Sequence, residues 1–144
     1  MDELIAAMKV YFATNFQYYT KAHGYHVNVI GPNFYQYHKL LQKVYEDAQE
    51  NIDAIAEEIR TLQSVVPFNF ERITELSKIE DADVLPDAEG MIAELLEDTE
   101  VLCDTIRLAH EIANDESAYG LVNYLEQRLD DHYKFQWMLR STLA

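Results

Sequence analysis

Residues 33–62 decide the fold, and they read NFYQYHKLLQKVYEDAQENIDAIAEEIRTL. Apolar residues recur in this stretch at unbroken intervals of three and four: Phe34, Tyr37, Leu41, Val44, Ala48, Ile52, Ile55, Ile59 and Leu62. That spacing puts them on one face of an α-helix, and so long an apolar face is typical of a helical bundle. At about 1.5 Å per residue the helix would span roughly 40 Å. We therefore expect a bundle built around this helix.

Similar patterns on either side predict four more helices, so the expected set covers residues 2–29, 33–62, 70–79, 86–113 and 116–142. Gly31-Pro32-Asn33 ends the first helix. Asn69 is expected to cap the short third helix, and Pro86 to occupy the first position of the fourth. Asn114-Asp115 is expected to break the fourth helix and cap the last one.

Four long helices with one short helix between the second and third predict an all-α fold, an antiparallel four-helix bundle. The link over residues 63–85 is long enough to cross between helix pairs, and one long crossover is a mark of ferritin-like bundles. No repeat, low-complexity run or linker interrupts the chain, so residues 1–144 are expected to form a single domain. Cytokine bundles share this outline, so topology alone does not give the function.

The charge balance is strongly acidic, with 26 acidic and 11 basic residues and a formal net charge of −15. Such a surface repels DNA, and no run of Lys or Arg is present, so we expect no DNA binding. The acidic side chains either keep the protein soluble or bind cations. The single Cys103, a start without basic residues and the lack of a long apolar run predict a soluble, cytoplasmic protein without membrane contact.

The sequence lacks the motifs of several common kinds of active and binding site. The sequence has no Gly-rich phosphate loop, no Cys-x-x-Cys and no His-Glu-x-x-His. Glu-x-x-His, the pattern of di-iron sites inside one bundle, is also absent, so a metal centre in the middle of the bundle is not expected.

Two histidines and two carboxylates remain as candidates. His26 lies near the end of the first helix, His38 near the start of the second, and Asp53 and Glu57 share one face further along it. Taken singly, the carboxylates fit a solvated face and the histidines fit capping or packing. Together, imidazole and carboxylate suit ferrous iron, whose borderline character accepts nitrogen and oxygen.

Helix length restricts how these residues can combine. His38 and Asp53 are fifteen positions apart, which is roughly 22 Å along one straight helix. They cannot hold one metal ion within one chain. If all four act together, the histidines must come from one subunit and the carboxylates from another. An antiparallel two-fold dimer, with helix two against helix two, would make two equal sites.

The segment His26-Val-Asn-Val-Ile-Gly-Pro-Asn-Phe34, then His38, then Asp53-Ala-Ile-Ala-Glu57, resembles the signature of Dps proteins, the bacterial mini-ferritins. The spacings match that family's ferroxidase ligands without insertion. Residues 75–79 and 131–140 resemble its middle helix and carboxyl end, so the likeness covers nearly the whole chain.

This resemblance implies a twelve-subunit shell that oxidises Fe²⁺ at two-fold interfaces, commonly with hydrogen peroxide and alternatively with O₂, and stores ferric mineral. It makes His26, His38, Asp53 and Glu57 both the catalytic residues and the metal ligands, with iron as substrate and zinc as another ion for the same site. The basic terminal extension by which some members bind DNA has no counterpart here.

Three positions depart from the family pattern. Val27 stands where a Trp is usual, Gln42 where many members have an Asp ligand, and Glu58 where Arg is common. The loss of the Asp predicts a weakly held second iron. Two other hypotheses therefore stay open: a cage with weak or lost oxidation, and a plain acidic bundle that binds a basic partner.

The remaining polar residues receive weaker assignments. His23, His110 and His132 are expected to be structural or on the surface, and Trp137 to be a core or interface anchor. Acidic residues that could nucleate mineral are Glu46, Asp47 and Glu50, and those that could line entry pores are Asp115, Glu116, Asp130 and Asp131.

Overall fold

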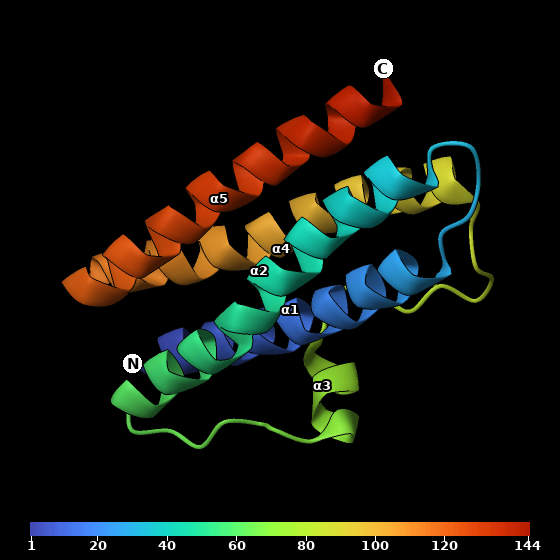
Figure 1. The fold of residues 1–144 in the computed structure, drawn as a ribbon. Helices are drawn as coiled ribbons and strands as arrows, with labels where there is room; N and C mark the ends of the chain where they lie inside the picture. Colours follow the sequence, from blue (N-terminus) through green and yellow to red (C-terminus); the bar gives the residue numbers. More distant parts are fainter.

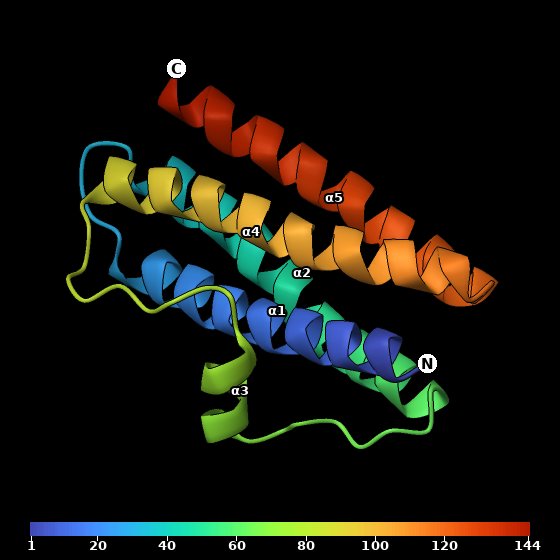
Figure 2. The same cartoon turned by 180° about the vertical axis from the view of Figure 1, so that it is seen from behind.

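The computed structural model describes all 144 residues and contains five α-helices and no strand (Figure 1). They are α1 (Asp2–Asn28), α2 (Phe34–Thr61), α3 (Phe70–Leu76), α4 (Ala88–Asp115) and α5 (Tyr119–Leu143). The helices α1 and α2 form one antiparallel hairpin, and α4 and α5 form the second (Figures 1 and 2). The connection between the hairpins runs back along the bundle and carries α3. The predicted fold class is confirmed.

One apolar core lies between the four long helices, and the apolar face that the sequence predicts for α2 points into it. Six of its nine residues are buried: Tyr37, Leu41, Val44, Ala48, Ile55 and Ile59. Phe34, at the start of the helix, is exposed. The first helix adds large aromatic side chains to the core, among them Tyr11, Phe12 and Tyr18, which are fully buried. Burial of this continuous core is the main force that holds the bundle together.

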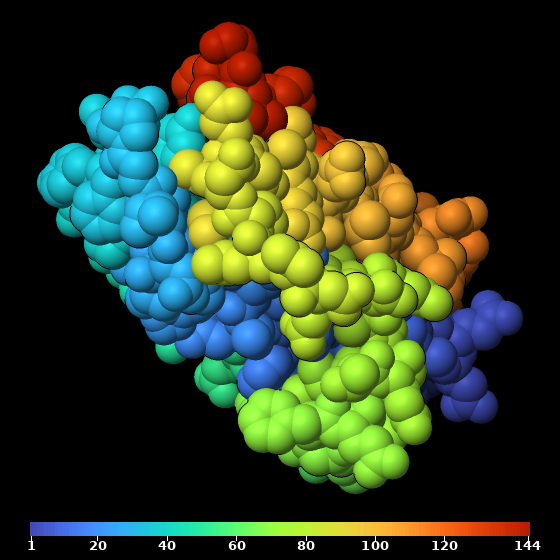
Figure 3. Space-filling model, turned by 90° about the vertical axis from the view of Figure 1, so that its right-hand side faces the viewer, coloured from blue at the N-terminus to red at the C-terminus, as the bar shows by residue number.

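The crossover attaches to the outside of α1. Figure 3 shows the green and yellow segment lying over the blue surface of that helix. The Phe68 ring packs on Phe12 at 5.2 Å between centroids, and its edge meets Phe16 at 6.0 Å. None of the helices is both long and apolar enough to span a membrane.

Two predicted helix bounds near the crossover were wrong. The third helix ends at Leu76, not near residue 79, because Ser77 is extended and the Lys78 amide donates to the Thr14 hydroxyl at 3.1 Å. The fourth begins at Ala88, with Asp87 as its cap: the Asp87 carboxylate accepts from the Gly90 amide at 2.8 Å. Pro86 therefore precedes the helix. The expected Asn69 cap is confirmed, since its side chain accepts from the Arg72 amide.

The last helix begins at Tyr119, three residues later than predicted, and neither Asn114 nor Asp115 caps it. The chain leaves α4 through Ser117, whose φ of 58° is in the left-handed region. The Ala118 amide donates to the Ala113 carbonyl at 2.9 Å, and the Ser117 amide to the Asn114 carbonyl at 3.1 Å. These two hydrogen bonds form a Schellman motif at the end of α4. Ser117 occupies the left-handed position of this motif, where glycine is usual.

Candidate metal centre

The turn between α1 and α2 brings His26 and His38 together. His26 lies in the last turn of α1 and His38 at the start of α2, and Gly31, with a φ of 129°, makes the reversal possible. The two rings stack with centroids 3.8 Å apart and planes 16° apart. His26 is buried and His38 is half-buried. The sequence prediction that one chain supplies both imidazoles in one place agrees with this geometry.

Hydrogen bonds fix which nitrogen of each ring is free. Nδ1 of His26 bonds to the main-chain oxygen of His38, and Nδ1 of His38 bonds to that of His26, both at 2.8 Å. A carbonyl oxygen only accepts, so each Nδ1 carries a proton. In the neutral rings the lone pairs are therefore on the two Nε2 atoms. A metal-binding histidine is usually held in this way, by a bond from its second nitrogen to a carbonyl or carboxylate.

Asp53 and Glu57 form a second polar group, on the exposed face of α2. A hydrogen-bond contact with Asp53, and then repulsion from its charge, raise the pKa of Glu57 above its ordinary value. Two carboxylates held one helical turn apart without a cation between them repel each other, and a bound cation would relieve that repulsion.

The single chain does not join the two groups. No cluster of three or more His, Cys, Asp or Glu residues within one chain has metal-binding geometry. The straight path of α2 keeps His38 and Asp53 at opposite ends of the helix (Figure 1). Each group by itself offers two ligands, so a site made of all four residues would need a second chain.

Comparisons with known proteins agree with the fold. The ferritin-like domain family matches residues 5–144. A low temperature-induced protein of Nostoc is 37% identical over 123 residues, covering 84% of this chain and 69% of the relative. DNA protection during starvation protein 2 of Bacillus anthracis is 30% identical over 128 residues, which cover 87% of this chain and 86% of the relative. The crystal structure of Dps from Staphylococcus aureus superposes with a TM-score of 0.95 at 25% identity, over 100% and 97% of the two chains.

The chain belongs to the Dps family of ferritin-like proteins. Within this Dps-family bundle the three departures from the family pattern have visible consequences. Val27 is 62% exposed and borders a hollow of about 230 Å³. Gln42 donates to the Glu46 carboxylate at 2.8 Å, so its amide nitrogen is already engaged. Glu58 is half-buried, and burial raises its pKa.

Sequence reasoning missed a polar cluster inside the bundle, here called the interior cluster: Asp47, Arg128, Asp131 and His132. Arg128 is 3% exposed and pairs with Asp47 on α2 and with Asp131 at 3.0 Å. Its guanidinium also donates to Nε2 of His132 at 3.1 Å. Burial, and then the Arg128 charge, hold the pKa of His132 well below its usual range. The signal was present, because Leu121, Leu125, Arg128 and His132 share the core spacing of α5.

Two of the acidic residues named as mineral or pore candidates belong to this cluster. Asp47 and Asp131 are ion-paired with the buried Arg128, and their roles in mineral nucleation and in a pore stay predictions. Glu46 and Glu50 are exposed, as are Asp115 and Asp130, and Asp130 lies 3.3 Å from Lys134. Glu116 pairs with the amino terminus of the chain.

His110, His132 and the tryptophan lie outside the candidate centre, whereas the His23 ring lies 6.1 Å from the His26 ring between centroids. His132 is fully buried and structural, and His110 contacts Glu126 at 3.0 Å. Trp137 is 61% exposed, which excludes the core and leaves an interface role as a prediction.

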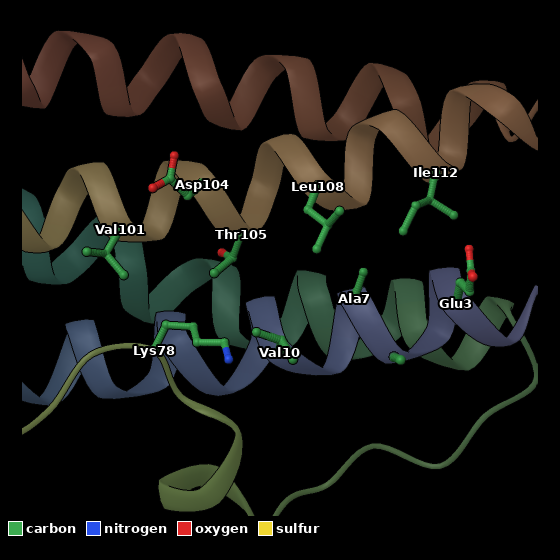
Figure 4. A pocket seen from close by; sticks show the side chains of 10 residues that line it. Glu3, Ala7, Val10, Lys78, Val101, Asp104, Thr105, Leu108 and Ile112 are labelled. Carbon is green, nitrogen blue, oxygen red and sulfur yellow. The ribbon is translucent and has the colours of Figure 1, made fainter.

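A larger hollow lies elsewhere. It is a groove of about 740 Å³ between α1 and α4, where Val101, Leu108 and Ile112 face Ala7 and Val10 (Figure 4). Its charged residues, Glu3, Lys78 and Asp104, lie around the edges and do not converge on a point (Figure 4). The groove therefore has no chemistry of its own.

Proposed function

We propose that the chain is a ferroxidase and iron-storage subunit, which oxidises Fe²⁺ at sites shared between two copies and deposits ferric mineral inside a cage. The observation that carries the proposal is the histidine pair: two stacked imidazoles whose Nδ1 atoms are fixed, so both Nε2 lone pairs are available in one place. Two neutral nitrogens bind Fe²⁺ but lack the charge that Fe³⁺ prefers. His26 and His38 are the proposed nitrogen ligands, and Asp53 and Glu57 of a second copy are the proposed oxygen ligands.

The proposed assembly is a homo-oligomer, a dodecamer built from two-fold dimers. Large apolar side chains gather on the crossover and are exposed in the single chain: Val65 by 75%, Phe68 by 58% and Phe70 by 80%. Exposed apolar groups so concentrated support a contact with another subunit. A two-fold axis across antiparallel α2 helices would place each His pair near the carboxylates of the neighbour. Light scattering after size-exclusion chromatography should give a mass near twelve chains.

Iron oxidation by the assembled protein tests the proposal. Ferrous iron is mixed with hydrogen peroxide, the proposed oxidant, or with O₂, and ferric absorbance is followed. We expect rapid oxidation by the wild type and loss of the fast phase in His26→Ala/His38→Ala, because the nitrogen ligands are gone. His110→Ala is the matched control, since it removes a histidine outside the site. Equal rates in the double variant and the wild type would reject the assignment.

A second function is favoured by Gln42 and Val27: a cage of the same build whose oxidation is weak or lost. It would hold Zn²⁺ or Fe²⁺ at the same four residues without rapid turnover. Normal assembly and tight zinc binding, with no fast ferric phase, would select this alternative. For either function we propose a cytoplasmic protein that does not bind DNA, because the net charge of −15 repels phosphate.

A further inference from the structure

A chain of neighbouring aromatic rings leads from the candidate iron ligands to Tyr19. The Tyr45 ring lies 5.0 Å from His26 between centroids. His23 lies flat on Tyr45, with centroids 3.9 Å and planes 2° apart. The Tyr19 hydroxyl is 2.8 Å from Nδ1 of His23. The path of close rings therefore runs, in order, through His38, His26, Tyr45, His23 and Tyr19.

Within this path Tyr19 is the residue suited to give up an electron. A phenol that loses an electron also loses its proton, so oxidation is easy only where a base accepts that proton. His23, in the tautomer that carries its proton on Nε2, accepts it at Nδ1. Tyr45 has no hydrogen-bond partner for its hydroxyl, which suits it to bridge between rings. Outside the path, Tyr25 also faces a base, Glu94 at 2.8 Å, but its ring stacks on none of these residues.

The electron count of peroxide reduction gives this pair a role. Reducing hydrogen peroxide to water takes two electrons, and a ferrous ion supplies one. One turn after His38 on α2, Gln42 offers only a neutral amide, and that amide donates to the Glu46 carboxylate at 2.8 Å. A site that holds one ferrous ion needs another donor, because otherwise the second oxygen leaves as a hydroxyl radical.

We propose that Tyr19, with His23 as proton acceptor and Tyr45 as bridge, supplies the second electron when peroxide reacts with a single bound Fe²⁺. The balance is Fe²⁺ + H₂O₂ + Tyr–OH → Fe³⁺ + OH⁻ + H₂O + Tyr–O•. The O–O bond breaks, iron and Tyr19 are each oxidised by one electron, and the phenol proton passes to His23 and then to product. The proposal rests on the iron oxidation proposed above.

In the single chain the same pair borders a hollow on its other side. Tyr19 and His23 border this hollow of about 230 Å³ next to Val27, with Thr20 and Gly24 as its other walls. In the single chain a small reductant such as a thiol or ascorbate can therefore reach the oxidised tyrosine. The buried tyrosines Tyr11 and Tyr18 lack such access.

The test is a rapid-freeze experiment on the assembled protein. Protein loaded under argon with one ferrous ion per site is mixed with one equivalent of peroxide, and ferric absorbance and electron paramagnetic resonance are recorded together. We expect a tyrosyl radical in the wild type and its loss in Tyr19→Phe, which keeps the ring. His23→Phe keeps a ring on Tyr45 but removes the base, and should also lose the signal. Tyr25→Phe, the matched control, should keep it.

Spin trapping provides an independent readout. Tyr19→Phe should release more trapped hydroxyl radical than the wild type at the same ferric yield. An equal tyrosyl signal in Tyr19→Phe and the wild type would overturn the inference. Formation of ferric product in the wild type without any tyrosyl radical would also overturn the inference, but it would leave the proposed iron oxidation in place. Absence of ferric product in the wild type would instead remove the proposed function, and this inference with it.

Discussion

Two polar groups of the chain are built from the same residue types, histidine and carboxylate, but have opposite environments. The interior cluster is closed: the buried Arg128 neutralises Asp47 and Asp131 and bonds to His132. The ligand groups on α1 and α2 are open: both Nε2 atoms of the histidine pair are free, and Asp53 and Glu57 repel each other at the surface. A neutralised carboxylate has little capacity to bind a cation, whereas free imidazole lone pairs and repelling carboxylates retain that capacity. We therefore expect changes in the interior cluster to alter stability, and changes in the ligand groups to alter metal binding.

The largest effect is expected from Arg128→Leu. The substitution leaves Asp47 and Asp131 without their cation between α2 and α5, and breaking a buried pair costs about 3 kcal/mol or more. Urea unfolding should show this loss, while zinc affinity of the folded protein stays within twofold of the wild type. Unchanged stability would show that the two groups do not differ as described.

Asp53→Asn should have the reverse profile. It removes a proposed ligand charge from an exposed position, so the metal dissociation constant should rise by at least about tenfold while stability changes little. The pKa of Glu57 should fall toward its ordinary value, because the hydrogen-bond contact with the Asp53 carboxyl and the repulsion from its charge are both gone. Calorimetric titration with Zn²⁺ measures the first effect. Glu50→Gln, an exposed acid one turn earlier, is the control and should bind like the wild type.

The interior cluster should also make stability depend on pH. Its environment lowers the pKa of His132, so below about pH 6.5 the unfolded chain gains a proton that the folded chain refuses. The free energy of unfolding should therefore decrease as the pH is lowered below this value. His132 accounts for up to about 1.4 kcal/mol of that decrease per pH unit. Urea unfolding at pH 8 and pH 5.5 should show a smaller fall in His132→Phe than in the wild type. The stability of His110→Gln should decrease between these two pH values by as much as that of the wild type.

The smallest effect concerns the end of α4, away from both groups. Ser117 has a φ of 58°, where a side chain is strained and glycine is not. Ser117→Gly should raise the free energy of unfolding by about 0.5–1 kcal/mol, with no change in iron oxidation. A destabilised variant would mean that the Ser117 side chain contributes something that the backbone geometry does not explain.

The sequence predicts the helices well and their ends less well. The periodic apolar residues of α2 gave nearly its full length, because burial on one face leaves a regular pattern. Some ends failed where no glycine or proline marked them, and the start of α4 was misplaced by two residues although Pro86 marked it. Ser117, and likewise Gln63 at φ 63°, adopt left-handed turns without the residue that usually signals one. Tertiary contacts decided the others, as where Thr14 binds the Lys78 amide and stops α3 from continuing.

The candidate site is predictable only in part. Spacing identified four residues and required two chains, and the structure brings His26 and His38 together. The reciprocal hydrogen bonds of His26 and His38 depend on the turn at Gly31, which periodicity does not describe. The interior cluster was missed because an arginine and a histidine at core spacing look like breaks in the stripe until their partners are known.

The central claim is that each site takes its imidazoles from one chain and its carboxylates from another, and mixed cages test it most directly. His26→Ala/His38→Ala and Asp53→Asn/Glu57→Gln are each expected to be inactive alone. Co-assembled in equal amounts, half of the two-fold dimers contain one chain of each kind, and each of these has one complete site out of two. We therefore predict recovery of about a quarter of the wild-type rate of ferric formation. Mixed cages as inactive as either variant alone would contradict a site shared between chains.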